Sequence, residues 1–251
     1  MTAPPPWTLT GNGLVIVAHF PESFVRQHGF LEPYQRAAYR GWVGTVMLVD
    51  YQTSGVGPYG ELLFIPGLFG FRHDWGKLLS FSISKIYVST DDSVQNGRRN
   101  WGIPKEPADF RFTTEAGGHR HVVVSRSGTA LLSLRAKPWG PRLPISTNWL
   151  PGFRVTQRTD PAFTTDDGYR LLLTRPSASG SARLARLSDV RVNPAYFPDF
   201  DRIRPLAVLS VENFRMTFPV PQIVPVRAGV GATGPDAPRV GERVIRERGR
   251  G

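Results

Sequence analysis

The stretch GRRNWGIPKEPADF, Gly97–Phe110, carries both the turn signals and the reactive group that decide how this chain is organised. Its central residue, Lys105, follows a glycine, an isoleucine and a proline, and only four of the chain's 31 lysines and arginines are lysines. An amine can lose its proton and attack a carbonyl carbon, whereas a guanidinium stays charged. The hypothesis is that Lys105 forms an imine, and the alternative is that it is a solvated loop residue.

The local sequence predicts a backbone that holds Lys105 still. We expect a short helix over Asp91–Trp101, with an aspartate as its N-cap and Gly102 as its C-terminal stop. Pro104 fixes its own φ and restricts the residue before it. Lys105 would thus leave a turn of little conformational freedom, as an attacking nucleophile requires.

Other residues of the segment would shape the surroundings of the amine. Trp101, Ile103 and Phe110 are predicted to supply an apolar wall. Glu106 is adjacent to Lys105 in sequence, but side chains of consecutive residues on extended backbone point to opposite faces. The acid and the amine would then be separated by the strand itself.

Strand signals dominate the rest of the chain. With 26 glycines and 23 prolines, turn residues recur at short intervals, which is typical of short strands. We expect a mainly β fold, a closed or nearly closed antiparallel barrel with a few short helices, the first over Pro21–Gly29. The domain is expected over 1–226 and a flexible basic tail over 227–251. The expected strands are Leu14–Phe20, Thr45–Tyr51, Glu61–Ile65, Leu79–Val88, His121–Arg126, Ala130–Ala136, Tyr169–Thr174, Ala182–Val192 and Leu206–Phe218.

Composition narrows the function classes. The net charge is +11, but the arginines are scattered without the basic stripe that phosphate tracking needs, so we expect no nucleic-acid partner. The chain has no cysteine, and its histidines show no ligand spacing, so we expect neither a metal nor another cofactor. No leader or apolar run long enough to span a membrane is evident, which favours a cytoplasmic protein without a membrane partner.

Two motifs resemble the acetoacetate decarboxylase-like family. Gly97–Lys105 reads as the family's G-R-x-x-W-G-[IF]-P-K, in which the reactive lysine directly follows the proline. Thr53–Glu61 reads as its T-S-G-x-G-x-Y-x-E, where a glutamate ends the motif. The resemblance implies a closed β-barrel or cone, a homo-oligomer, an imine between Lys105 and a keto acid, and Glu61 as the acid/base group.

The chain also departs from the family pattern. The true decarboxylases carry a second lysine after the reactive one, where this chain has Glu106. Counting along the sequence places Asn12 where they have an arginine and Val46 where they have a second active-site glutamate. We therefore expect a less polar pocket and a longer, more apolar carbonyl substrate than acetoacetate.

Three functions remain open from the sequence. The first is a lysine Schiff-base lyase of the decarboxylase or aldolase/dehydratase type, acting on a keto acid or related carbonyl compound. The second is a non-catalytic member of the same fold that binds a small apolar molecule, and the third is an arginine-rich nucleic-acid binder. For the first, the expected catalytic residues are Lys105 and Glu61, and the expected substrate-binding residues are Arg98, Arg99, Tyr59 and Trp101.

Overall fold

The computed structural model describes residues 2–73, 76–149, 152–164 and 170–225 of the chain. Within these ranges the chain forms sixteen strands and three α-helices, so the expected mainly β fold is confirmed. None of the helices in these ranges is long and apolar enough to cross a membrane. The basic tail expected over 227–251 lies outside the described residues.

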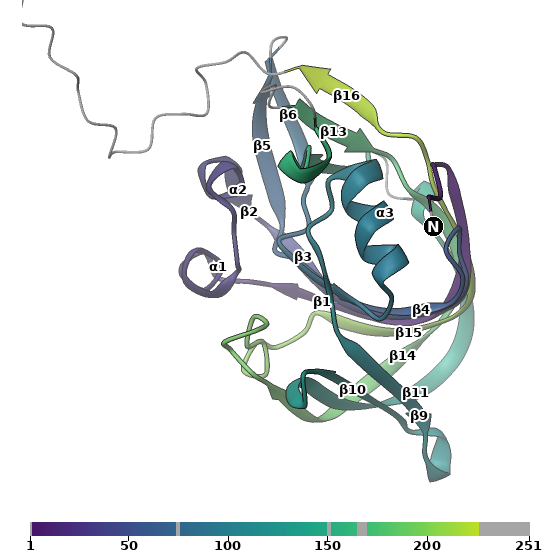
Figure 1. Cartoon of the computed structure of the whole chain (residues 1–251). Coiled ribbons are helices and arrows are strands. Elements are labelled where there is room, and N and C mark those ends of the chain that lie inside the picture. Colours follow the sequence, from purple (N-terminus) through teal and green to yellow (C-terminus); the bar gives the residue numbers. More distant parts are fainter. Residues whose placement is uncertain (1, 74–75, 150–151, 165–169, 226–251) are drawn as a thin grey trace, which may run out of the picture.

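The described strands form two sheets (Figure 1). The order in the ten-stranded sheet is β8 (Lys105–Pro107), β7 (Lys85–Val88), β4 (Tyr59–Ile65), β3 (Val43–Thr53), β1 (Trp7–His19), β15 (Ala207–Phe218), β14 (Ser177–Val192), β11 (Thr129–Ser146), β10 (Arg120–Arg126) and β9 (Asp109–Thr114). The order in the six-stranded sheet is β16 (Gln222–Pro225), β13 (Arg170–Thr174), β12 (Val155–Arg158), β6 (Gly76–Phe81), β5 (Leu68–His73) and β2 (Tyr39–Gly41). The α-helices are α1 (Glu22–His28), α2 (Pro33–Ala38) and α3 (Asp91–Trp101), and short 3-10 helices lie at Ala116–Gly118, Thr147–Trp149 and Pro161–Phe163.

The ten-stranded sheet curls until its two edges meet. Its edge strands, β8 and β9, are consecutive in the chain, and only Ala108 separates them. Because one residue spans at most about 3.6 Å, the end of one edge strand lies close to the beginning of the other. The nearly closed barrel expected from the sequence is therefore present, and Figure 1 shows α3 lying within the curve of β4, β1 and β15.

Two strand pairs depart from the expected antiparallel pattern. The pairs β7–β8 and β12–β6 are parallel. A parallel pair needs a crossover connection rather than a hairpin, and α3 supplies that crossover between β7 and β8. The helix expected over Asp91–Trp101 is therefore the element that turns the chain back to start β8.

Strand β4 is buried on both faces and separates two cores. We call the apolar cluster on one face the first core; it includes Leu14, Val46, Leu48, Leu62, Phe64, Val122, Val124 and Ala136. We call the cluster on the other face, against α3, the second core; it includes Val49, Tyr51, Tyr59, Leu63, Ile86, Val88, Val94, Trp101 and Ile103. Alternation along the strand thus assigns each residue of β3 and β4 to one core or the other.

The single strand expected over Leu79–Val88 is wrong. The segment forms β6 and β7, which belong to different sheets. Between them, the fully buried Ser82 donates a hydrogen bond to Gln157 (3.0 Å) and accepts one from Gln35 (2.8 Å). The alternating pattern of small polar residues therefore marks a buried polar contact with α2 and β12, where the chain passes from one sheet to the other.

The helix ends match the prediction in part. The N-cap of α3 is Thr90, whose hydroxyl accepts a hydrogen bond from the backbone N–H of Ser93 (3.3 Å), and not the aspartate that we expected. The expected C-terminal stop is confirmed, because Gly102 has φ +63°. Helix α1 lies within the expected segment Pro21–Gly29, whereas α2 was not predicted.

Replacing Gly102 tests how strongly this turn supports the fold. A Cβ at this position would overlap the carbonyl oxygen of Arg158, in addition to the positive-φ penalty of about 1 kcal/mol. Gly128 has φ +79° with open space around it, so Gly128→Ala incurs the φ penalty alone. We expect Gly102→Ala to lower the free energy of unfolding clearly more than Gly128→Ala in urea denaturation. Equal decreases in the free energy of unfolding would mean that the overlap with the carbonyl oxygen of Arg158 does not destabilise the Gly102→Ala protein.

Candidate active site

Lys105 is held between the sheet and α3. It is the first residue of β8 and pairs with Ile86 of the parallel strand β7. Its side chain runs beneath the helix into the second core and is only 5% exposed. A lysine in such a position keeps its amine out of solvent.

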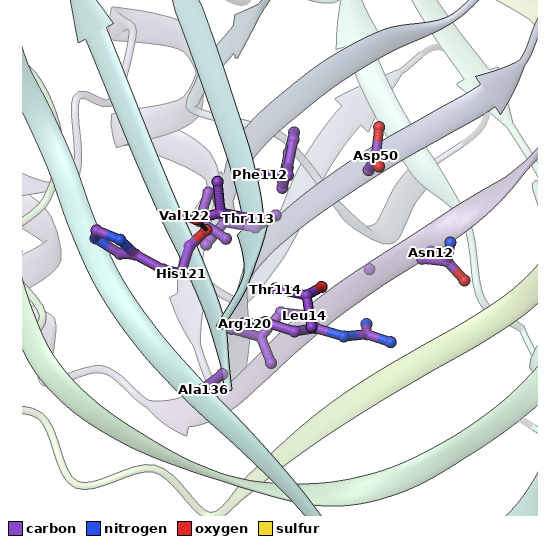
Figure 2. A pocket seen from close by; sticks show the side chains of 12 residues that line it. Asn12, Leu14, Asp50, Phe112, Thr113, Thr114, Arg120, His121, Val122 and Ala136 are labelled. Carbon is purple, nitrogen blue, oxygen red and sulfur yellow. Dashed lines mark hydrogen bonds between the residues drawn. The ribbon is translucent and has the colours of Figure 1, made fainter. Parts of the chain in front are cut away.

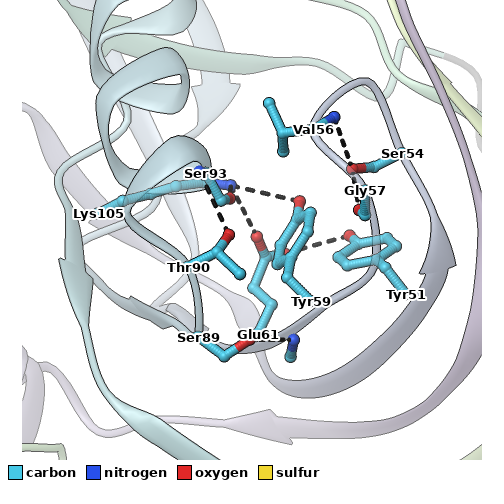
Figure 3. A network of polar contacts seen from close by, with 11 residues as sticks. Tyr51, Ser54, Val56, Gly57, Tyr59, Glu61, Ser89, Thr90, Ser93 and Lys105 are labelled. Atoms are coloured by element: carbon cyan, nitrogen blue, oxygen red, sulfur yellow. Dashed lines mark hydrogen bonds and ion pairs between the residues drawn. The ribbon is translucent and has the colours of Figure 1, made fainter. Parts of the chain in front are cut away.

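Three polar groups converge on the amine (Figure 3). Nζ of Lys105 lies 3.0 Å from Oε2 of Glu61 and 3.0 Å from Oγ of Ser93. The hydroxyl of Tyr59 is the most distant of the three, at 3.4 Å. All three partners are buried, so these contacts replace the water that the amine would otherwise bind.

The carboxylate of Glu61 lies in an otherwise apolar stretch of sheet. On β4 its cross-strand neighbours are Val49 and Val88, both buried. The hydroxyl of Tyr51 donates a hydrogen bond to Oε1 (3.2 Å), which leaves Oε2 directed at the lysine. The carboxylate is thus oriented by one donor and paired through its other oxygen.

The two tyrosines of the site remain neutral donors. Burial raises the pKa of Tyr51 and Tyr59 well above the ordinary value, and the negative charge of Glu61 adds to the increase. A phenol that stays protonated at neutral pH can donate a hydrogen bond to a carboxylate or to a developing oxyanion.

A glycine in α3 leaves the space that the lysine stem occupies. A Cβ at Gly97 would lie 2.5 Å from Cδ and 2.8 Å from Cε of Lys105, closer than carbon atoms approach without a shift. Ser93 and Gly97 are four residues apart and therefore share one face of the helix. That face carries the Ser93 hydroxyl, which contacts the amine, and the space at Gly97, which the aliphatic part of the Lys105 side chain occupies.

The amine and the carboxylate are the two charged side chains among the buried residues that the structure describes. At 3.0 Å they can exchange a proton directly. The arrangement can therefore generate a neutral amine next to a carboxylic acid in apolar surroundings. This is the chemistry of a lysine that forms an imine with a carbonyl compound.

Comparison with known proteins agrees with this geometry. The family model for acetoacetate decarboxylase (ADC) matches residues 29–153, a range that contains every residue of the site. The chain is a divergent member of the acetoacetate decarboxylase-like family. No curated protein matches the chain by sequence.

Solved structures of the acetoacetate decarboxylase-like fold superimpose over most of the chain at low identity. An acetoacetate decarboxylase from Legionella pneumophila has a TM-score of 0.66 at 14% identity, covering 88% of each chain. The enduracididine biosynthesis enzyme MppR complexed with pyruvate has a TM-score of 0.60 at 15% identity, covering 89% of this chain and 91% of that one. An acetoacetate decarboxylase-like enzyme from Sphingomonas wittichii RW1 has a TM-score of 0.60 at 11% identity, covering 90% and 94%.

Glu106 lies on the opposite side of β8 from the amine, as alternation predicts. Its carboxylate accepts hydrogen bonds from Lys85 (2.5 Å) and Arg126 (2.7 Å). Burial would raise the pKa of Glu106, but the hydrogen bonds and charges of these two cations outweigh it and lower the pKa. The residue that replaces the decarboxylases' second lysine therefore belongs to a separate charge cluster.

The structure does not bring the two arginines of α3 to the amine. Arg98 pairs with Asp160 at 2.6 Å, and Arg99 donates a hydrogen bond to Thr2 (3.3 Å). Trp101 does lie in the second core, where its ring meets Trp7 edge-on at 5.0 Å. Substrate binding by these three residues of α3 stays a prediction.

Three positions expected near the lysine face the first core instead. Asn12 lies opposite Asp50 in the β1–β3 register and lines a cavity on that side, and Val46 packs into the first core. Phe110 packs there too, against Gly60 of β4. Tyr59 and Glu61, on alternate positions of β4, face the second core. The family correspondences at Asn12 and Val46 therefore do not place these two residues at the site. The expectation that Phe110 forms part of an apolar wall around Lys105 is wrong.

Ser93 and Tyr51 were missed as site residues. The sequence carries a weak signal for Ser93, because it stands four residues before Gly97 in a helix predicted to precede the lysine. Tyr51 carries none, because its role depends on the β3–β4 register that pairs it with Tyr59. Cross-strand partners of this kind are not readable from one sequence.

Gly97→Ala should displace Lys105 while leaving the helix intact, because alanine favours a helix and the overlap falls on the lysine stem. We expect faster acylation of Lys105 by acetic anhydride, mapped by mass spectrometry, than in the wild type. Gln95→Ala, on the exposed side of α3, is the matched control and should leave the rate unchanged. Identical rates in all three proteins would show that the space at Gly97 does not position the amine.

Proposed function

We propose that the protein is a lysine Schiff-base lyase that acts on a keto acid or related carbonyl compound. The observation that carries the proposal is the buried contact between Lys105 and Glu61, 3.0 Å apart in apolar surroundings. A structural lysine would not need a buried site, since solvent stabilises its charge at no cost.

The reaction begins with a proton transfer from the ammonium of Lys105 to Oε2 of Glu61. The neutral amine attacks the carbonyl carbon, Glu61 gives the proton to the carbinolamine hydroxyl, and water leaves to form a protonated imine. Loss of CO₂ from the adjacent carbon leaves a neutral enamine. Glu61 then passes a proton from water to that carbon, and hydrolysis of the resulting imine releases the ketone or aldehyde and restores the ammonium of Lys105.

Tyr59 is placed to take part when the substrate arrives. Its contact with Nζ is the longest of the three, so it is the one that an incoming carbonyl group most readily replaces. Because burial keeps its phenol protonated, Tyr59 can donate a hydrogen bond to the carbonyl oxygen as negative charge develops there. Ser93 and Glu61 meanwhile hold the amine in position.

The surroundings of the pair favour an apolar substrate. The cross-strand neighbours of Glu61 are both valines, and Leu63 and Ile103 belong to the same core. Asn12 and Val46 do not bear on this preference, because they face the other core. The second core itself supports it, since it lacks a second buried charged group to hold a small carboxylate among the described residues.

Lys105→Arg should abolish imine formation while preserving the positive charge, because a guanidinium does not give up its proton at neutral pH. Borohydride reduction in the presence of pyruvate should add mass at Lys105 in the wild type. The same treatment of the variant should add no mass to the peptide that contains the substituted position. Peptide mapping by mass spectrometry measures both outcomes.

The control for this substitution is Lys137→Arg, at an exposed lysine, which should trap pyruvate like the wild type. Turnover by the Lys105→Arg protein above a few per cent of the wild-type rate would contradict the imine mechanism. Absence of any trapped adduct in the wild type would favour the non-catalytic binding function.

Glu61→Gln should separate imine formation from the proton transfer to carbon. The amide keeps the size of the side chain but cannot accept the ammonium proton, which solvent must then take, so borohydride trapping should persist at a lower rate. Turnover should fall by about 10²–10⁴-fold, the usual contribution of a general acid–base group. Glu22→Gln, at an exposed glutamate of α1, is the matched control. An unchanged kcat in Glu61→Gln would remove Glu61 from the mechanism.

The apolar surroundings predict the order of substrates. We expect borohydride trapping to be more efficient with phenylpyruvate and other long or aromatic carbonyl compounds than with acetoacetate, and CO₂ release from acetoacetate to be weak. Steady-state CO₂ release and trapping yield across the same series of compounds test this order. Acetoacetate turnover at the rate of a dedicated decarboxylase would show that the second core binds a small carboxylate after all.

A further inference from the structure

A cavity of about 210 Å³ lies between β1 and β3 on one side and the β9–β10 hairpin on the other (Figure 2). Leu14, Leu48 and Val122 of the first core supply its apolar lining. Its volume is that of roughly seven water molecules. The cavity is therefore on the scale of a small metabolite rather than of a larger, drug-sized ligand.

This cavity is separate from the lysine site. Asp50 and Tyr51 are consecutive on β3, so their side chains point to opposite faces of the sheet. Tyr51 contacts Glu61 in the second core, whereas Asp50 lines the cavity. A molecule in the cavity is thus divided from Lys105 by the sheet, and its binding does not depend on the proposed imine chemistry.

One side of the cavity presents the carboxylate of Asp50. No residue that the structure describes donates a hydrogen bond to Asp50, although its side chain is partly buried. Burial raises the pKa of Asp50, and the charge of Arg120 only partly offsets this effect. A carboxylate at an apolar lining is stabilised by a cation that carries hydrogen-bond donors.

The other side presents excess positive charge. Arg120 donates a hydrogen bond to Glu212 (3.2 Å), and the same carboxylate also accepts one from Arg142. Two guanidinium groups therefore share one carboxylate, which leaves a net charge of +1 beside the cavity. Figure 2 shows the Arg120 side chain directed toward the side on which Asn12 lies.

We propose that this cavity binds a small zwitterion of the amino-acid class. The ammonium group pairs with Asp50, the carboxylate group pairs with Arg120, and a short apolar side chain lies against Leu14 and Leu48. Asn12, directly opposite Asp50 in the β1–β3 register, adds an amide at the polar end of the site.

Titration calorimetry of the full chain with L-valine tests the proposal. We expect saturable binding, and about tenfold or greater weakening in both Asp50→Asn and Arg120→Gln, because each removes one charge-assisted contact. Isobutylamine lacks the carboxylate and 3-methylbutanoate lacks the ammonium, so each should bind about tenfold more weakly than valine. Asp109→Asn, at an exposed carboxylate of β9, should bind valine like the wild type.

Three results would overturn the proposal. The first is the absence of saturable valine binding to a wild-type protein that is folded by circular dichroism. The second is undiminished binding in Asp50→Asn, or binding of isobutylamine as strong as that of valine. The third is loss of valine binding in Lys105→Arg, which would assign valine to the lysine site. Retention in Lys105→Arg is expected, whether or not that variant forms an imine.

Discussion

The buried pair Lys105–Glu61 is the interaction on which the organisation of this molecule depends. Removing a charge from water costs several kcal/mol, and losing one partner of such a buried pair typically costs about 3–5 kcal/mol. The pair is stable only because β4, β8 and α3 each deliver one part of its environment: the carboxylate, the amine and the Ser93 hydroxyl. The crossover that makes β8 parallel to β7 is what brings these parts together.

The sheet also keeps a second set of charges away from this pair. Glu106 is the next residue after Lys105, yet it binds Lys85 and Arg126 on the opposite side of β8. These contacts connect β7, β8 and β10, so they fix the strand from which the lysine projects. The acid that replaces a cation in the family's motif therefore supports the position of the amine without entering its surroundings.

Much of the site was predictable because its signals are local. The Gly102 stop, the rigid turn before Lys105 and the alternation that separates Glu106 depend only on neighbouring residues, and all three are present. The break between β6 and β7 was not predictable, since Ser82 is explained by partners on α2 and β12. Tyr51 was missed for the same reason: its contact depends on strand register.

Counting residues along the sequence placed Asn12 and Val46 at the lysine site, whereas both face the first core. Such counting fails where a strand is irregular, or where the face to which each residue points is unknown. Side chains alternate with period two, so an error of one residue moves a group to the other core. In its pairing with β15, strand β1 has a register shift between Gly11 and Gly13, at Asn12. Val46 is adjacent to Met47, which packs against the second core. The absence of charge at these two positions therefore says nothing about the surroundings of Lys105. Under the proposed function, substrate preference is set by the side chains that share the second core with Glu61, and these are predominantly apolar.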